Sequence, residues 1–91
     1  MKVRVLVRLR PGIMDVQGAA VQRALVGLGF RDLRDLRVGK VIEVDVDAST
    51  AAVAHGRVDE MCKKLLANPV LEDYTIETIE VPNLAAARAV R

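Results

Sequence analysis

The residue types that could perform chemistry are few in this sequence, and they do not form a catalytic pattern. The single histidine, His55, has Asp59 four residues further on, a spacing that places both side chains on one face of a helix. A surface helix pair explains this spacing better than a catalytic base, because no nucleophile accompanies it. The single cysteine, Cys62, follows Met61 in an apolar stripe, where a buried and unreactive thiol is expected. Neither residue therefore predicts an active site.

Nucleotide and metal sites are not indicated either. Gly27 and Gly29 follow a helical pattern, whereas phosphate-binding glycine loops follow a strand and open a helix. Glu72 and Asp73 are adjacent, so in an extended chain their side chains point to opposite faces and cannot act as a paired acid and base. One histidine and one cysteine can supply neither a typical zinc site nor an internal disulfide. We therefore expect no catalytic, cofactor-binding or metal-binding residue on this chain.

Length and composition predict one small domain that gains stability by association. The chain has 91 residues, of which 52% are hydrophobic and only 2% aromatic, so its core must consist of Val, Leu, Ile and Ala. Domains below about 80 residues usually need disulfides, metals or oligomerisation, and this chain is only slightly longer. The net charge of +2 is spread along the sequence and predicts no nucleic-acid or membrane partner. The lone cysteine and the lack of an apolar run of about 20 residues lead us to expect a cytoplasmic protein.

The first half of the chain reads as a strand, a helix and a second strand. Strict alternation over residues 2–10 predicts a strand with one buried face, and Pro11-Gly12 ends it. Asp15 is placed to cap a helix that stops at Gly27 and Gly29. The apolar positions of this helix recur at three- and four-residue spacing: Met14, Gly18, Val21, Leu25 and Leu28. Residues 33–38 are then expected to form a short strand.

The second half repeats this order. Gly39-Lys40 is predicted to turn the chain into a strand over residues 41–46. Ser49 or Thr50 caps a second helix, which Asn68-Pro69 ends. Its expected buried stripe is Ala51, Ala54, Val58, Met61, Cys62 and Leu65. Residues 74–81 read as the last strand, which gives a domain over residues 1–81 and a C-terminal tail over residues 82–91.

The element order predicts an α+β fold of the βαββαβ type, related to the ferredoxin-like arrangement, with two helices on one face of a four-stranded sheet. On the opposite face, Arg4 and Arg8 would lie on a strand whose neighbours carry Glu43, Asp45 and Glu77, so opposite charges could pair across strands. This face is either open to water or covered by a second subunit. Exchange of strands within a dimer would instead divide the four strands between two chains and complete the sheet across the dimer.

Two stretches carry a family resemblance. Residues 11–18, Pro-Gly-Ile-Met-Asp-Val-Gln-Gly, lead into the first helix, Leu-Gly-Phe at residues 28–30 ends it, and Leu-Arg-Val-Gly-Lys-Val-Ile-Glu follows at residues 36–43. The second stretch, residues 61–74, is Met-Cys-Lys-Lys-Leu-Leu-Ala-Asn-Pro-Val-Leu-Glu-Asp-Tyr, with Ile76-Glu77 after it. Over residues 2–81, in this order and with this spacing, the chain resembles the PurS family. It departs from the family pattern after Val81, and the resemblance implies no role for that extension.

The resemblance implies a non-catalytic subunit of phosphoribosylformylglycinamidine synthase, a ligase of de novo purine biosynthesis that takes nitrogen from glutamine. In such a complex a PurQ-type glutaminase subunit releases ammonia, and a PurL-type synthase subunit uses ATP to install it on formylglycinamide ribonucleotide. The family's small subunit, a homodimer or homotetramer, bridges the other two subunits and supports ammonia transfer between them. ATP and magnesium would then bind the synthase subunit, and this chain would hold no cofactor.

The same resemblance places possible partner contacts on two segments of this chain: Arg37, Gly39 and Lys40 in the first, and Asn68, Glu72, Asp73 and Tyr74 in the second. Each also has a local explanation, with Gly39 as a turn residue, Asn68 as part of a helix stop and Tyr74 as a core side chain with a wet hydroxyl. An ACT-like module that binds a small regulatory molecule shares the element order and is the alternative. An RNA-recognition domain is disfavoured because residues 2–10 and 41–46 contain no aromatic side chain for base stacking.

Overall fold

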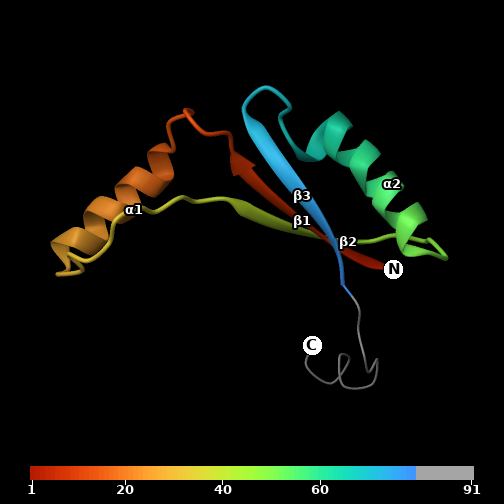
Figure 1. The fold of residues 1–91 in the computed structure, drawn as a ribbon, viewed down its shortest axis with the longest axis horizontal. Helices are drawn as coiled ribbons and strands as arrows, with labels where there is room; N and C mark the ends of the chain where they lie inside the picture. The colour runs from red at the N-terminus through yellow and green to blue at the C-terminus, as the bar shows by residue number, and fades with distance from the viewer. Residues whose placement is uncertain (80–91) are drawn as a thin grey trace, which may run out of the picture.

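The computed structural model describes residues 1–79, which form one antiparallel sheet and two helical segments beside it (Figure 1). The elements in chain order are β1 (Lys2–Leu9), α1 (Val16–Gly27), β2 (Lys40–Asp45), α2 (Ala51–Met61), the π-helical turn η1 (Cys62–Leu66) and β3 (Glu72–Thr78). The three strands are ordered β2-β1-β3, so the first strand is central. Positions 80 and 81 of the predicted last strand, and the predicted tail over residues 82–91, lie outside the described residues. The α+β class is confirmed.

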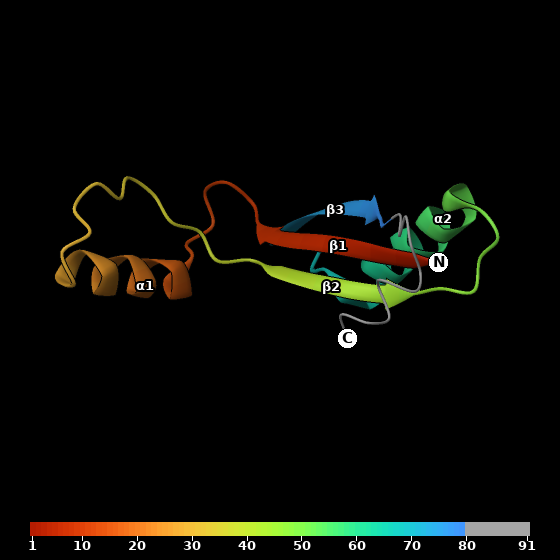
Figure 2. The same cartoon turned by 90° about the horizontal axis from the view of Figure 1, so that it is seen from below.

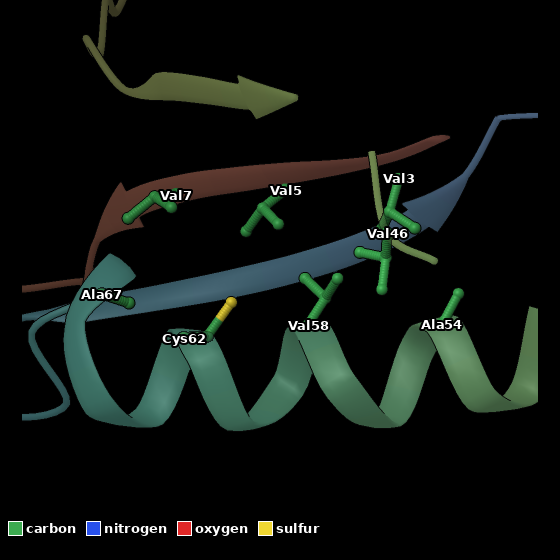
Figure 3. Packing of buried hydrophobic residues seen from close by; sticks show 8 residues of the cluster. All are labelled: Val3, Val5, Val7, Val46, Ala54, Val58, Cys62 and Ala67. Carbon is green, nitrogen blue, oxygen red and sulfur yellow. The ribbon is translucent and has the colours of Figure 1, made fainter. Parts of the chain in front are cut away.

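One face of the sheet is buried by α2 and η1. Val3, Val5 and Val7 alternate along β1 and are at most 2% exposed, as the strand pattern predicts. They point toward the helical segment, whose inward side chains meet them (Figure 3). The other members of this core are Val46, Ala54, Val58, Cys62 and Ala67. The predicted core position of Cys62 is therefore confirmed.

The opposite face of the sheet carries charged residues in register. Arg4 on β1 lies opposite Glu43 on β2 and opposite Glu77 on β3, as the sequence predicts. Arg8 lies opposite Asp73. Because side chains alternate along a strand, these residues are on the face away from α2. We refer to it as the open face.

The predicted helix boundaries are also confirmed. The Asp15 side chain accepts a hydrogen bond from the backbone N–H of Gly18 at 2.9 Å and so caps α1. Gly29 has φ +105°, a left-handed conformation that stops a helix without steric cost in glycine. Thr50 caps α2 by accepting from the N–H of Val53 at 3.2 Å. Capping chemistry is local, which is why the sequence alone reveals it.

The predicted strand over residues 33–38 is wrong, and the sheet of the described residues has three strands instead of four. Leu33, Leu36 and Val38 are spaced unevenly, so they cannot all lie on one face of a strand. This segment is an extended connection without strand pairing. The N–H of Val38 donates to the Asp15 carboxylate at 2.7 Å and not to a neighbouring strand. Gly39 consequently precedes β2 directly and is not part of a hairpin turn.

The position of α1 also differs from the prediction, since only one helical segment of residues 1–79 covers the sheet. Figures 1 and 2 show α1 standing to one side, beyond the end of β1, while α2 lies along the sheet. Of the predicted stripe on α1, Gly18 alone is buried, and Met14 and Leu28 are 74% and 75% exposed. In the second stripe, Leu65 is exposed as well, because the wider π-helical turn η1 changes the spacing of inward positions.

Candidate functional site

The two predicted contact segments meet at the end of the sheet where β1 finishes and where β2 and β3 begin. Lys40 is the first residue of β2 and Glu72 the first of β3, and Lys40 Nζ lies 3.8 Å from Glu72 Oε2. Glu72 Oε1 accepts from the N–H of Asn68 at 2.7 Å. The carbonyl of Asn68 in turn accepts from the N–H of Glu72 at 2.8 Å. The structure thus brings Lys40, Asn68 and Glu72 together.

Arg10, which sequence reasoning missed, fastens the turn between η1 and β3 to the end of β1. Its Nη1 lies 3.0 Å from Asp73 Oδ1, and its Nη2 donates to the carbonyl of Pro69 at 2.8 Å. The backbone N–H of Arg10 donates to the carbonyl of Leu71 at 2.8 Å. Three bonds from one residue hold this turn in place. The strand alternation located Arg10 at a strand end, but the long-range register that pairs it with Asp73 is not visible in the sequence.

Arg37 and Gly39 lie along the end of β1. Arg37 Nη2 donates to the carbonyl of Leu9 at 3.3 Å. A Cβ atom added to Gly39 would lie 2.6 Å from the carbonyl oxygen of Val7, which is closer than real Cβ contacts come. Gly39 is therefore required for a close approach of two backbones.

Asp15 connects the start of α1 to the segment that returns from it. Its Oδ1 accepts from Gly18 N–H at 2.9 Å and its Oδ2 from Val38 N–H at 2.7 Å, a pair of bonds that we call the Asp15 clasp. The Val38 bond, followed by the Gly18 bond, holds the pKa of this carboxyl below its usual value, and the charge of Arg37 acts in the same direction. A Cβ atom on Gly18 would run into the Asp15 carboxylate. The sequence identified Asp15 as a cap, but not its bond to a residue 23 positions away.

Tyr74 lies on the face of the sheet that α2 covers, opposite to the open face that carries Asp73, and it joins β3 to α2. Its hydroxyl donates to Asp59 Oδ1 at 2.6 Å, while Lys63 Nζ lies 2.9 Å from Asp59 Oδ2. The bond to the Asp59 carboxylate, aided by partial burial, raises the pKa of Tyr74 to about 12. The same hydroxyl and Lys63 lower the pKa of Asp59. The Tyr74 hydroxyl therefore has a hydrogen-bond partner within the fold, whereas the sequence predicted a hydroxyl exposed to water. His55, the predicted surface-pair partner of Asp59 on the helix, is exposed.

Two open grooves flank this end of the sheet. One, of about 350 Å³, lies between β1, the start of α1 and Lys40 and Glu72. The other, of about 410 Å³, is lined by Arg8, Leu9, Pro11, Arg37 and Asp73.

Burial of Cys62 raises the pKa of its thiol and keeps it protonated.

Among residues 1–79, no cluster of three or more His, Cys, Asp or Glu side chains is arranged to hold a metal ion. Neither helix in this part of the chain combines the length and hydropathy that a membrane span requires.

Comparison with known proteins identifies the family of this chain. Residues 2–80 match the family model for PurS, described as phosphoribosylformylglycinamidine (FGAM) synthase. The phosphoribosylformylglycinamidine synthase subunit PurS of Bacillus subtilis is 44% identical over 80 residues, which is 88% of this chain and 94% of that protein. The PurS of Methanocaldococcus jannaschii is 36% identical over 80 residues, covering 88% of this chain and 96% of that protein.

Solved structures agree in fold. The crystal structure of M. jannaschii PurS superposes with a TM-score of 0.76 at 38% identity, covering 87% of this chain and 98% of that one. A chain in the structure of PurLQS from Thermotoga maritima superposes with a TM-score of 0.79 at 31% identity, covering 86% of this chain and 95% of that one. These matches do not favour the ACT-like alternative. With a family match over residues 2–80, and relatives that are matched over 94–96% of their own length, this chain belongs to the PurS family.

Proposed function

We propose that this chain is the non-catalytic small subunit of a phosphoribosylformylglycinamidine synthase complex in de novo purine biosynthesis. The observation that carries the proposal is the match over residues 2–80 to a family whose members are named as subunits of this synthase. The similarity to a chain of the T. maritima PurLQS structure supports partners of the PurL and PurQ types. In this complex the chain bridges the glutaminase and the ATP-dependent synthase and supports ammonia transfer to formylglycinamide ribonucleotide.

The chemistry of the end of the sheet supports a bridging role. Lys40, Glu72, Arg10 and Asp73 form ion pairs that fix the backbone of two turns on one rigid end of the sheet. Surfaces that present polar groups on fixed backbone lose little conformational entropy when a partner binds. ATP and magnesium belong to the synthase subunit in this proposal, and the complex works in the cytoplasm.

The uncovered side of α1 supports self-association. Residues 14–30, which include α1, expose large apolar side chains: Met14, Val16, Val21, Val26, Leu28 and Phe30. Figures 1 and 2 show α1 standing to one side of the sheet instead of lying along it. Large apolar side chains exposed together along one segment are a feature of protein interfaces. A homodimer or homotetramer would cover it and would complete the sheet or the helix layer across subunits.

Sedimentation equilibrium tests self-association. The wild-type chain is expected as a dimer or tetramer, and Val26→Asp on α1 should shift it toward the monomer, because a charge would enter an apolar contact. Val53→Asp on α2, where the side chain is 51% exposed, is the matched control and should keep the wild-type mass. A wild-type monomer at the highest protein concentration would refute the self-association.

The activity of the reconstituted complex tests the bridging role. Formylglycinamidine ribonucleotide production is measured with the matching synthase and glutaminase subunits, with and without this chain, using glutamine or ammonium as nitrogen source. Glutamine-dependent activity is expected to require the chain, whereas ammonium-dependent activity should persist without it. If neither activity responds to the chain, the proposed function is wrong.

A further inference from the structure

A positively charged groove lies on the open face of the sheet, at the end of β1. It has a volume of about 410 Å³ and is lined by Arg8, Leu9, Pro11, Arg37 and Asp73. We call it the arginine groove. Arg8 faces it from the open side of β1, because the preceding residue, Val7, points into the core. Arg37 reaches it from the segment that returns from α1.

The two guanidinium groups of this groove are oriented by neutral acceptors and not by carboxylates. Arg8 Nη2 donates to the hydroxyl of Thr75 at 3.3 Å, and Arg37 Nη2 donates to the carbonyl of Leu9 at 3.3 Å. Among residues 1–79, neither arginine has a carboxylate oxygen within 4.0 Å. A guanidinium carries five N–H donors, so most donors of both groups remain available.

The one carboxylate in the groove is already neutralised. Asp73 lies opposite Arg8 in the strand register, yet its Oδ1 pairs with Arg10 at 3.0 Å. Arg8 and Arg37 therefore keep their positive charge in the groove, and the nearby Asp15 carboxylate, whose pKa the charge of Arg37 lowers, offsets it in part. The groove presents guanidinium N–H donors that no carboxylate of residues 1–79 occupies.

We propose that the arginine groove receives the carboxylate side chains of an acidic segment on a partner subunit of the synthase complex, an inference that rests on the proposed function. Planar guanidinium groups bind carboxylates through two parallel hydrogen bonds, and they are favoured at protein interfaces over the more strongly hydrated lysine. A small free anion fits less well, because an ion pair in an open, hydrated groove gains little. A protein segment would cover the groove and exclude water, which strengthens the same pairs.

Binding of this chain to its partners tests the inference. The affinity of the double variant R8E/R37E for the matching synthase and glutaminase subunits is measured by biolayer interferometry at low and high salt. Since truncation or reversal of a covered charge pair costs about 2 kcal/mol or more, affinity should fall by about 30-fold or more. R8K/R37K, which keeps both charges, should show an intermediate loss. Arg57→Glu on α2 is the control, because it makes the same arginine-to-glutamate change away from the groove, at a side chain that is 61% exposed. This variant should bind as the wild type does.

The outcomes separate this inference from the proposed function. If the wild-type chain joins neither subunit, the proposed function fails. If the wild type joins and R8E/R37E joins equally well with an unchanged circular dichroism melting curve, the groove is not the contact and the inference is overturned. Loss of self-association by R8E/R37E in sedimentation would instead assign the groove to a second copy of this chain. Saturable binding of inorganic phosphate to the isolated chain, abolished in R8E/R37E, would assign it to a small anion.

Discussion

Replacement of Val58 by alanine tests whether the face of α2 seen in Figure 3 supports the fold. Val58 is 0% exposed and lies in the core against β1. Removing its two methyl groups loses about 1.6 kcal/mol of transfer free energy, at about 0.8 kcal/mol per group. A residual cavity adds about 1 kcal/mol, and the higher helix propensity of alanine returns about 0.5 kcal/mol. The expected loss in the free energy of unfolding is about 2 kcal/mol.

The assay is thermal unfolding followed by circular dichroism. In a domain of this size, 1 kcal/mol shifts Tm by about 4–8 °C, so Val58→Ala should lower Tm by about 8–16 °C. Val53→Ala makes the same chemical change on the same helix at a side chain that is 51% exposed. Because it loses little burial and gains helix propensity, Tm should stay constant or rise by a few degrees. Both variants are compared at one protein concentration, since self-association makes Tm depend on concentration.

A small change in Tm for both variants would refute the packing of α2 described here. A large loss for both would mean that the exposed side of α2 is covered as well, so the control also reports on contacts made by that side in the assembly. The prediction thus depends on one helix, two valines and their difference in exposure.

Three further predictions concern titratable groups. The absorbance of the single tyrosine should titrate near pH 12, because the Tyr74 hydroxyl donates to Asp59. The contribution of this hydrogen bond to stability is present below pH 10 and is lost as pH rises through about 12. Asp59→Asn should return the titration midpoint toward 10. A midpoint at 10 in the wild type would contradict this bond. Buried Cys62, whose thiol pKa is raised, should react with an aromatic disulfide reagent far more slowly in the native protein than in denaturant, and equal rates would place it at the surface. The amide NMR shifts of Gly18 and Val38 should titrate together with a midpoint below 3.8, because the pKa of Asp15 is lowered. The Asp15 clasp is present above pH 3.8 and is lost as pH falls through the pKa of the folded state. Different midpoints for the two amides would show that the two hydrogen bonds do not depend on the same carboxylate.

The sequence predicts the parts of this fold that depend on local chemistry. Alternation along β1 identifies the buried valines, and Asp15, Thr50 and Gly29 mark helix ends, because a cap or a left-handed glycine involves only a few neighbouring residues. Cys62 follows from the helical spacing of the second stripe in the same way.

Features that depend on distant residues could not be predicted. The apolar residues at 33–38 already alternate poorly, and Val38 bonds to Asp15, 23 positions away, instead of a sheet neighbour. That bond could not be predicted from the local pattern. The apolar positions of α1 predicted a core stripe, but Met14 and Leu28 are exposed, because helical periodicity does not reveal where the helix lies relative to the sheet. Arg10 was missed because its ion pair to Asp73 depends on strand register.

The predicted contact residues illustrate both cases. Lys40, Asn68 and Glu72 form one cluster, and Arg37 and Asp73 share a groove. These are proposals for partner contact. Tyr74 is different, because its bond to Asp59 on α2 gives it a role within the fold. The predicted contact segment at residues 68–74 therefore contains both exposed polar residues and a tyrosine that supports the fold.

The placement of α1 beside the sheet has a consequence for the life of the protein in the cell. A helix of 12 residues without an apolar layer beneath it is marginal in water, so a solitary copy should open its α1 amides to hydrogen exchange long before the sheet unfolds. Proteases cut such transiently opened segments. Copies made in excess of their partners would then be removed first, and turnover of the surplus would match the amount of this subunit to the amount of complex that can be built.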